Sequence, residues 1–220
     1  MNNDKIKTRI ASFCFNPFQE NTYVISHIAS GDCWIIDPGC YTLQEEKKLF
    51  DYIDSNGLKP VKLLNTHCHL DHIYGNKAVA DKYRLGLGIH EKEIQVLQSA
   101  PLGARLFGAK IPAALEPSYF ISAGEVLNLH DVEFDVLFCP GHSPGSICFA
   151  NKEEQYAIVG DVLFNGSIGR TDLPGGDYDT LIKSIRNQLY VLSDETEIFN
   201  GHGPLTTIGQ EKTHNPFVRA

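Results

Sequence analysis

The sequence lacks several features that would assign it to particular classes of protein. No apolar run is long enough to cross a membrane, and the first residues lack the apolar core of a secretory signal. The net charge is −8 and no stripe of basic residues occurs, which argues against nucleic acid as a partner. The six cysteines contain no C-x-x-C pair. We therefore expect a cytoplasmic protein with free thiols and with neither a membrane nor a nucleic-acid partner.

Linkers, low-complexity stretches and charge runs are also absent. The 220 residues are 42% apolar, which is enough for one domain with a sizeable core. Each half contains β-forming runs followed by helical patterns, which predicts an α/β fold with two sheets and outer helices. One domain is expected over residues 1–220. Strands are predicted at 6–15, 22–26, 33–36, 61–64, 87–90, 125–129, 133–138, 147–150, 156–159 and 197–200, and helices at 42–57, 76–83, 91–98 and 177–192.

Residues 101–120 differ from the rest of the chain. Prolines and glycines are expected to break regular structure there, although several apolar side chains lie between them. Two interpretations stay open: an irregular packed connection, or a mobile wall over a functional site.

The densest group of chemically useful side chains follows the apolar run 61–64, in the segment N-T-H-C-H-L-D-H-I-Y-G at 65–75. In an extended chain residues i and i+2 point the same way, so His67 and His69 can converge. A turn is needed before Asp71 and His72 both face that centre. Imidazoles and carboxylates this dense suit zinc or another first-row ion. Cys68 would point away and is expected to pack in the core.

Three more ligand-type side chains follow apolar runs that end in glycine: His142, Asp161 and His202. Strand ends feed the loops on which α/β folds gather their sites, and the glycines allow sharp turns close to an ion. We therefore expect these residues to meet the 67–72 segment. Asp37, in Asp-Pro-Gly, is either part of a simple turn or a carboxylate that holds a ligand histidine.

These residues match a known pattern. H-x-H-x-D-H followed by separate His, Asp and His resembles the metallo-β-lactamase superfamily, over residues 21–202. The resemblance implies a four-layer αββα sandwich with two metal ions at one edge of the sheets. By the family pattern Asp161 bridges the ions, and Asp71 and Asp161 are the predicted catalytic carboxylates. Two Zn²⁺ are expected, with iron or manganese as alternatives at either site. The implied ligands are His67, His69 and His142 for the first ion, and Asp71, His72 and His202 for the second.

Within the superfamily the chain resembles the glyoxalase II-like branch, through Gly160–Phe164 and Gly169-Arg170. This implies a hydrolase that uses a metal-bound hydroxide to cleave a small thioester, in the manner of a hydroxyacylglutathione hydrolase. Two dications would leave the pocket net positive, which favours an anionic substrate. Only 18 residues follow His202, too few for the glutathione-gripping extension of glyoxalase II, so glutathione specificity stays open.

Three other functions compete with this hydrolase. A mononuclear iron persulfide dioxygenase would use His67, His142 and Asp161, and shares the segment Gly-Arg-Thr-Asp at 169–172. The complete second ligand set argues against it, and the missing export signal argues against a β-lactamase. The remaining alternative is a metal-binding module without activity. Arg170 is either a substrate anchor or an ion-pair partner of Asp172.

Overall fold

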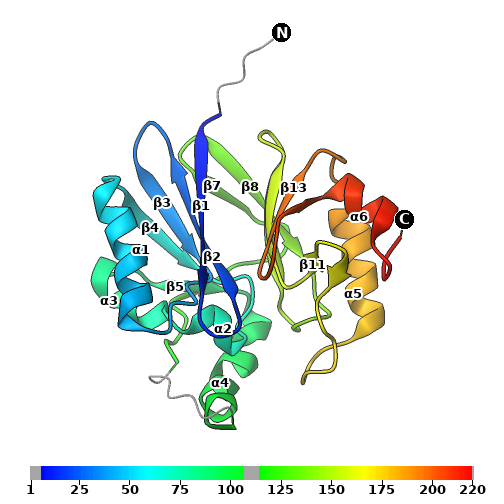
Figure 1. Cartoon of the computed structure of the whole chain (residues 1–220), viewed down its shortest axis with the longest axis horizontal. Coiled ribbons are helices and arrows are strands. Elements are labelled where there is room, and N and C mark those ends of the chain that lie inside the picture. The colour runs from blue at the N-terminus through cyan, green and yellow to red at the C-terminus, as the bar shows by residue number, and fades with distance from the viewer. Residues whose placement is uncertain (1–5, 107–113, 220) are drawn as a thin grey trace.

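A computed structural model describes residues 6–106 and 114–219, with the backbone alone for 101–106. Two sheets lie face to face, and helices cover both outer faces (Figure 1). This arrangement confirms the predicted αββα sandwich. The first sheet has the strand order β1 (Thr8–Phe15), β2 (Glu20–His27), β3 (Asp32–Ile36), β4 (Lys59–Leu64), β5 (Leu87–Ile89) and β6 (Tyr119–Phe120). The second has the order β14 (Thr206–Thr207), β13 (Glu197–Asn200), β10 (Tyr156–Gly160), β9 (Ile147–Asn151), β8 (Val132–Phe138) and β7 (Val126–Leu129).

The helices separate into two outer layers. The first sheet is covered by α1 (Leu43–Ser55) and α3 (Asn76–Tyr83). The second is covered by α5 (Tyr178–Ser184), its π-helical continuation η2 (Ile185–Leu189), and α6 (Ile208–His214). The remaining elements are α2 (Leu70–Ile73), the 3₁₀ helix η1 (Glu91–Glu93), α4 (Ile94–Leu106) and the hairpin of β11 (Leu163–Phe164) and β12 (Ser167–Ile168). Among the described residues, no helix combines the length and apolarity needed to cross a membrane.

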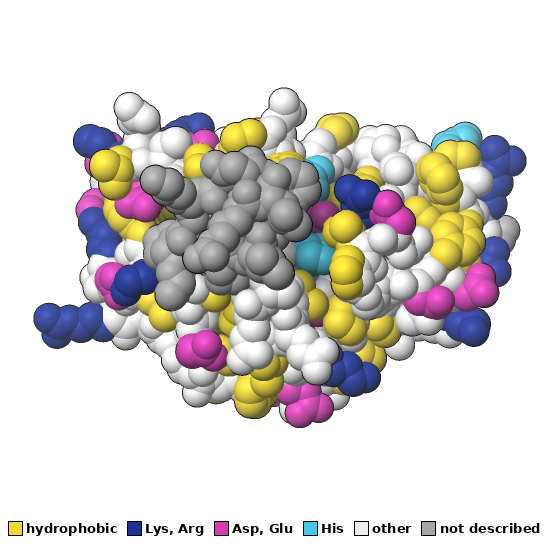
Figure 2. Space-filling view, turned by 90° about the horizontal axis from the view of Figure 1, so that it is seen from below, with side chains coloured by type: hydrophobic (Ala, Val, Ile, Leu, Met, Phe, Trp, Pro, Cys, Tyr) yellow, Lys and Arg dark blue, Asp and Glu magenta, His cyan; other side chains and the backbone are white. Residues whose placement is uncertain are grey.

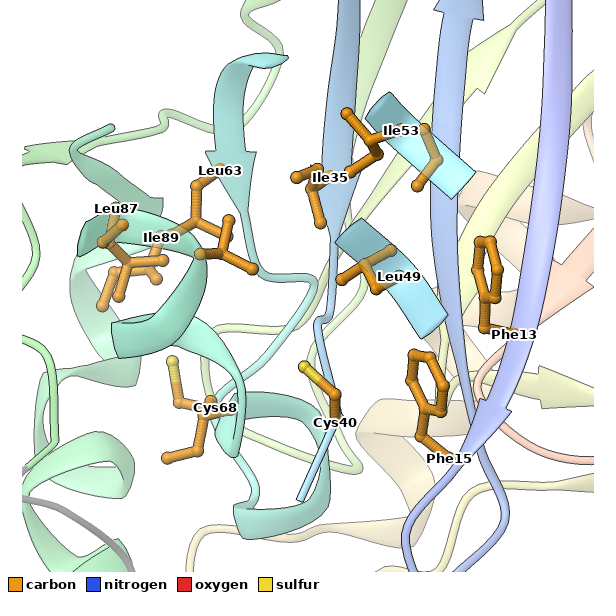
Figure 3. Close-up of a cluster of buried hydrophobic side chains, with 14 of the residues drawn as sticks. Phe13, Phe15, Ile35, Cys40, Leu49, Ile53, Leu63, Cys68, Leu87 and Ile89 are labelled. Atoms are coloured by element: carbon orange, nitrogen blue, oxygen red, sulfur yellow. The ribbon is translucent and has the colours of Figure 1, made fainter. Parts of the chain in front are cut away.

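Successive side chains of the central strands point to opposite faces of the sheet, and both faces are buried. In β3, Trp34 and Ile36 enter the core between the sheets, whereas Cys33 and Ile35 face the helices. This is the period of two expected for a strand whose two faces are both covered. Figure 3 shows the helix-side core, in which Leu49 and Ile53 of α1 pack near Phe13 and Phe15 of β1, and the Cys40 and Cys68 side chains belong to the same cluster. The prediction that Cys68 packs in the core is confirmed by its complete burial.

Local signals account for α1 but not for α4. Thr42 and Glu45 form the predicted capping box, which satisfies the first backbone N–H groups of α1. The expectation that Pro101 and Gly103 break regular structure is wrong, because α4 continues through both to Leu106. The predicted helix 177–192 is capped by Asp177 but changes to π-helical geometry at 185–189. Part of the segment 101–120, including residues 107–113, lies outside the described residues.

Parallel pairing places the candidate site residues at one edge. β3 pairs parallel with β4, and β10 pairs parallel with β13. β8 runs in the direction of β10, because both are antiparallel to β9. Carboxyl ends of strands that run the same way meet at one edge of a sheet. The candidate residues that follow these ends are Asp37 after β3, His67 after β4, His142 after β8, Asp161 after β10 and His202 after β13.

Candidate metal centre

All seven predicted ligand side chains meet at this edge. Three groups have potential ligand atoms within 4.8 Å of one another: His67, His69 and His142; Asp71, His72 and His202; and Asp37, His67 and His72, in which Asp37 bonds to His72 from behind. Asp161 lies between the first two groups. Helix α2 begins at Leu70, so the chain turns at the point where Asp71 and His72 need it to do so.

The first group presents three imidazole nitrogens to one point. Nδ1 of His69 lies 2.8 Å from Nε2 of His142. The His67 ring stands nearly perpendicular to both, with centroids 4.9 Å from each. Two facing ring nitrogens require a shared proton or a cation between the rings. Three converging imidazoles provide the ligand number of a catalytic zinc site that keeps an open position.

The second group combines two imidazoles and a carboxylate. Nε2 of His202 lies 3.1 Å from Oδ2 of Asp71, and Nε2 of His72 lies 3.7 Å from that same oxygen. Ligands about 2.0–2.2 Å from a tetrahedral ion stand roughly 3.3–3.6 Å apart, so these spacings suit one ion.

The carboxylate of Asp161 faces both groups. Its Oδ2 lies 3.5 Å from Nε2 of His142 and 3.5 Å from Nε2 of His202, while its Oδ1 lies 3.3 Å from Nε2 of His72. A carboxylate with its oxygens directed at two ligand sets has the geometry required to bridge two ions.

Several buried polar atoms at this place lack a hydrogen-bond partner. They include Nε2 of His67, and also Nε2 of His72 and Oδ1 of Asp161, which lie 3.3 Å apart and face each other as an ion pair when His72 is protonated. Buried polar atoms are nearly always satisfied, so unsatisfied atoms gathered at one point indicate missing partners. Nitrogen and carboxylate-oxygen donors suit divalent first-row ions. The donor set and the unsatisfied atoms therefore both fit a pair of metal ions.

Asp37 orients two of the histidines. Its carboxylate accepts hydrogen bonds from Thr66 N–H at 2.7 Å, Thr66 Oγ1 at 2.6 Å and His72 Nδ1 at 3.2 Å. Because Thr66 Oγ1 donates to Asp37, it accepts from Nδ1 of His67 at 3.1 Å. Both rings therefore carry their proton on Nδ1 and present Nε2 to the site. Of the two interpretations of Asp37, the structure favours the carboxylate that holds a histidine.

Backbone carbonyls orient two more rings. His142 donates from Nδ1 to the carbonyl oxygen of Arg170 at 2.8 Å, and His202 donates from Nδ1 to that of Phe18 at 3.0 Å. A carbonyl oxygen can only accept, so Nε2 of each ring is left for the site. Fixing the tautomer in this way raises ligand basicity and removes a rotational freedom that binding would otherwise have to restrict.

Glycines at two positions allow the close approach. A Cβ at Gly201 would lie 2.0 Å from Oδ1 of Asp161, and a Cβ at Gly160 would lie 2.2 Å from Oγ1 of Thr66. Gly160 also has a φ of +51°, a conformation that other residues rarely adopt. These contacts explain why glycine precedes Asp161 and His202.

The histidines of the two groups differ in the direction of their pKa shifts. Burial lowers the pKa of His67 well below its usual value, and burial with the nearby His142 lowers that of His69 to about 3. Burial also acts to lower the pKa of His72, but Asp161 and Asp71 outweigh it and raise that pKa well above its usual value. The same two carboxylates raise the pKa of His202 to about 9 against the effect of burial. Without metal, the first group is therefore neutral at pH 7, and the histidines of the second are protonated.

This contrast predicts different pH dependences for the two ions. Ligand histidines must be neutral, so binding at the second group displaces a proton from His72 and from His202. Affinity there should fall by up to about 100-fold for each unit that the pH drops from about 8 to about 6. Affinity at the first group should change less than about threefold, because its imidazoles are already neutral. Competition with a metal-binding dye at a series of pH values measures the metal affinity of both groups. Equal slopes of affinity against pH for the two groups would contradict the assigned protonation states.

A pocket of about 560 Å³ opens onto these residues. Figure 2 views the face of the molecule that is seen from below in Figure 1. Histidine and acidic side chains lie near the middle of that face, with hydrophobic side chains beside them. Apolar surface dominates the described lining. It comes from both halves of the sandwich, with Leu70, Val96, Phe164, Ile168 and Leu173 among its members. Arg170 also lines the pocket, where both its Nε and Nη2 contact Asp172 at 2.7 Å, so of the two alternatives for Arg170 the ion pair is observed.

Four supporting groups were not predicted from the sequence: Thr66, the carbonyl oxygens of Arg170 and Phe18, and Glu93. Glu93 is completely buried beside the first histidine group. Its position in a charged stretch, Glu-Lys-Glu at 91–93, is typical of a solvated helix surface, so the sequence contains no signal for its burial.

Comparison with known proteins agrees with this geometry. A model of the metallo-β-lactamase superfamily matches residues 15–202. The hydroxyacylglutathione hydrolase GloC of Haemophilus influenzae is 45% identical over 190 residues, which cover 84% of this chain and 87% of that protein. The BLEG-1 B3 metallo-β-lactamase structure superposes with a TM-score of 0.88 at 36% identity, covering 96% of this chain and 100% of that one. A di-iron-bound structure of TTHA1623 gives a TM-score of 0.85 at 36% identity, covering 94% of this chain and 100% of that one. The chain therefore belongs to the metallo-β-lactamase superfamily.

Proposed function

We propose that this chain is a dinuclear metallohydrolase that cleaves a small anionic thioester. The observation behind the proposal is the convergence of two complete ligand groups on one bridging carboxylate, Asp161. The first ion would be held by His67, His69 and His142, and the second by Asp71, His72 and His202, with zinc expected at both. When bound, such ions lower the pKa of a water and polarise a carbonyl oxygen.

The chain's own residues would bind and orient the substrate. The apolar walls next to the ligand groups, such as Val96 and Phe164, suit the acyl and thioether portions of a thioester and exclude bulk water around them. Asp71 and Asp161 are the two carboxylates among the proposed ligands. They would hold the ions in position next to the scissile bond of the substrate. Because Arg170 is already paired with Asp172, it contributes less attraction for an anion than a free guanidinium would.

The relatives support the reaction class. The 45% identical protein from Haemophilus influenzae is named a hydroxyacylglutathione hydrolase, whose substrate is a thioester. A persulfide dioxygenase remains the second candidate because of the Gly-Arg-Thr-Asp segment at 169–172. That enzyme would need only His67, His142 and Asp161, and would leave the complete second group without a role.

One paired experiment separates the candidates. Protein expressed in metal-supplemented medium is weighed by native mass spectrometry, then tested on S-lactoylglutathione, on uncharged acyl thioesters, on a β-lactam and, with an oxygen electrode, on glutathione persulfide. We expect two ions per chain and thioester turnover. One iron with oxygen uptake would replace the hydrolase with the dioxygenase, and two ions without any turnover would indicate a metal-binding module.

A further inference from the structure

Glu93 links the loop that carries His67 and His69 to the loop that carries His142. Its hydrogen bonds go to neighbours of these histidines and not to the histidines themselves. The residue ends η1, which follows β5 of the first sheet, and its side chain is completely buried. Oε2 accepts a hydrogen bond from the backbone N–H of Cys68 at 2.8 Å. Oε1 accepts from Oγ of Ser143 at 2.5 Å and from the backbone N–H of Gly145 at 2.6 Å.

These three donors lie in the two loops that carry the first ligand group. Cys68 lies between His67 and His69 in sequence, and Ser143 directly follows His142. The first loop leaves the first sheet and the second loop leaves the second sheet, so one carboxylate spans both halves of the sandwich. The second group has other supports, because His72 bonds to Asp37 and His202 to the Phe18 carbonyl.

Close packing makes this contact specific. A Cβ at Gly145 would lie 2.8 Å from Cγ and 2.9 Å from Oε1 of Glu93, closer than atoms of neighbouring side chains can approach. Only glycine lets this loop reach the carboxylate. A buried carboxylate also has high desolvation cost, and here every hydrogen bond that offsets this cost comes from a loop bearing a ligand.

We propose that Glu93 is a positioning residue that sets the distance from His67 and His69 to His142, and so controls binding at the first metal site. The inference rests on the proposed dinuclear function. It extends that function by assigning a residue outside the ligand set that acts on one ion and not on the other. Supporting residues of this kind typically change metal affinity by about 10- to 100-fold when altered.

The test variant is Glu93→Gln, which keeps the size of the side chain. The amide offers one oxygen and one NH₂, so its nitrogen must face either the Cys68 N–H or the Gly145 N–H, donor against donor. The matched control is Glu211→Gln. Glu211 is also a buried glutamate, and it accepts from Thr206, Gly166 and Asn215, none of which lies in the two loops that carry His67, His69 and His142.

Zinc is the probe, titrated against a chromophoric chelator and counted by mass spectrometry. We expect Glu93→Gln to lower affinity at one site by about 10- to 100-fold, so that bound zinc falls from two ions toward one, while the other site changes less than about threefold. Glu211→Gln should keep two ions even if its melting temperature falls. Should Glu93→Gln not fold, Ser143→Ala removes one of the three bonds and should shift the same site in the same direction, by a smaller factor.

Three results would overturn the inference. In the first, Glu93→Gln, or Ser143→Ala in its place, binds two ions with parental affinities. In the second, Glu211→Gln loses the same ion to the same extent, which would make the effect a general loosening of the fold. In the third, the parent chain binds fewer than two ions, which would also remove the proposed function. The first two results leave that function standing, so the two failures are distinguishable.

Discussion

Asp161→Asn is expected to lower kcat/KM for thioester hydrolysis by about 10³-fold or more while the fold survives. Asparagine keeps the shape of the side chain but removes the charge and replaces one oxygen with an NH₂ group. That group would face Nε2 of His72, or those of His142 and His202, and none of these positions tolerates a donor beside a metal ion. A loss of several kcal/mol of charge stabilisation corresponds to about this factor.

The comparison needs a matched aspartate. Asp172 is exposed next to the pocket-lining Arg170, so Asp172→Asn makes the same chemical change away from the ligand groups. It should retain turnover within about tenfold and bind two ions. Circular dichroism and melting temperature establish that both variants fold. Full metal content together with full turnover in purified Asp161→Asn would show that the bridging role is wrong.

Asp37→Asn is expected to have the second large effect, on stability and on the second ion together. The carboxylate is 1% exposed and accepts from Asn65, both donors of Thr66, and His72. An amide nitrogen at this place would face donors that cannot move away, because all are buried. Leaving buried donors unsatisfied beside a lost charge costs roughly 3 kcal/mol or more in unfolding free energy.

Asparagine is the appropriate replacement at Asp37. The residue has a φ of +48°, which asparagine adopts more readily than alanine, so asparagine keeps backbone strain out of the comparison. Thr66→Val keeps the backbone N–H bond to Asp37 but removes the hydroxyl bonds to Asp37 and His67, and should cost about 1–2 kcal/mol. Denaturant unfolding with zinc titration measures both quantities. If Asp37→Asn loses less stability than Thr66→Val and keeps the second ion, Asp37 is only a turn residue.

The candidate ligand residues could be identified from the sequence because local rules apply to several of them, and the family resemblance supplied their division into two groups. Alternation along an extended chain placed His67 and His69 on one side, and the adjacency of Asp71 and His72 required the turn that α2 supplies. Glycine before Asp161 and before His202 was expected to allow sharp turns close to an ion, and the structure shows close approaches of Gly160 to Thr66 and of Gly201 to Asp161.

The supporting groups could not be predicted, because their chemistry is not encoded in residue type. The Arg170 contact uses a carbonyl oxygen, which every residue possesses. Glu93 bonds to two backbone N–H groups and to a serine 50 residues away, a pairing that only the tertiary fold creates. Helix α4 shows the same limit in its backbone, since it continues through Pro101 against local propensity.

A crystal structure of the zinc-loaded protein, with anomalous maps recorded on either side of the zinc absorption edge, tests the central claim most directly. We predict two peaks. One should lie among His67, His69 and His142, the other among Asp71, His72 and His202, with an oxygen of Asp161 within about 2.2 Å of each. A single peak, or peaks that Asp161 does not contact, would contradict the bridged pair of ions.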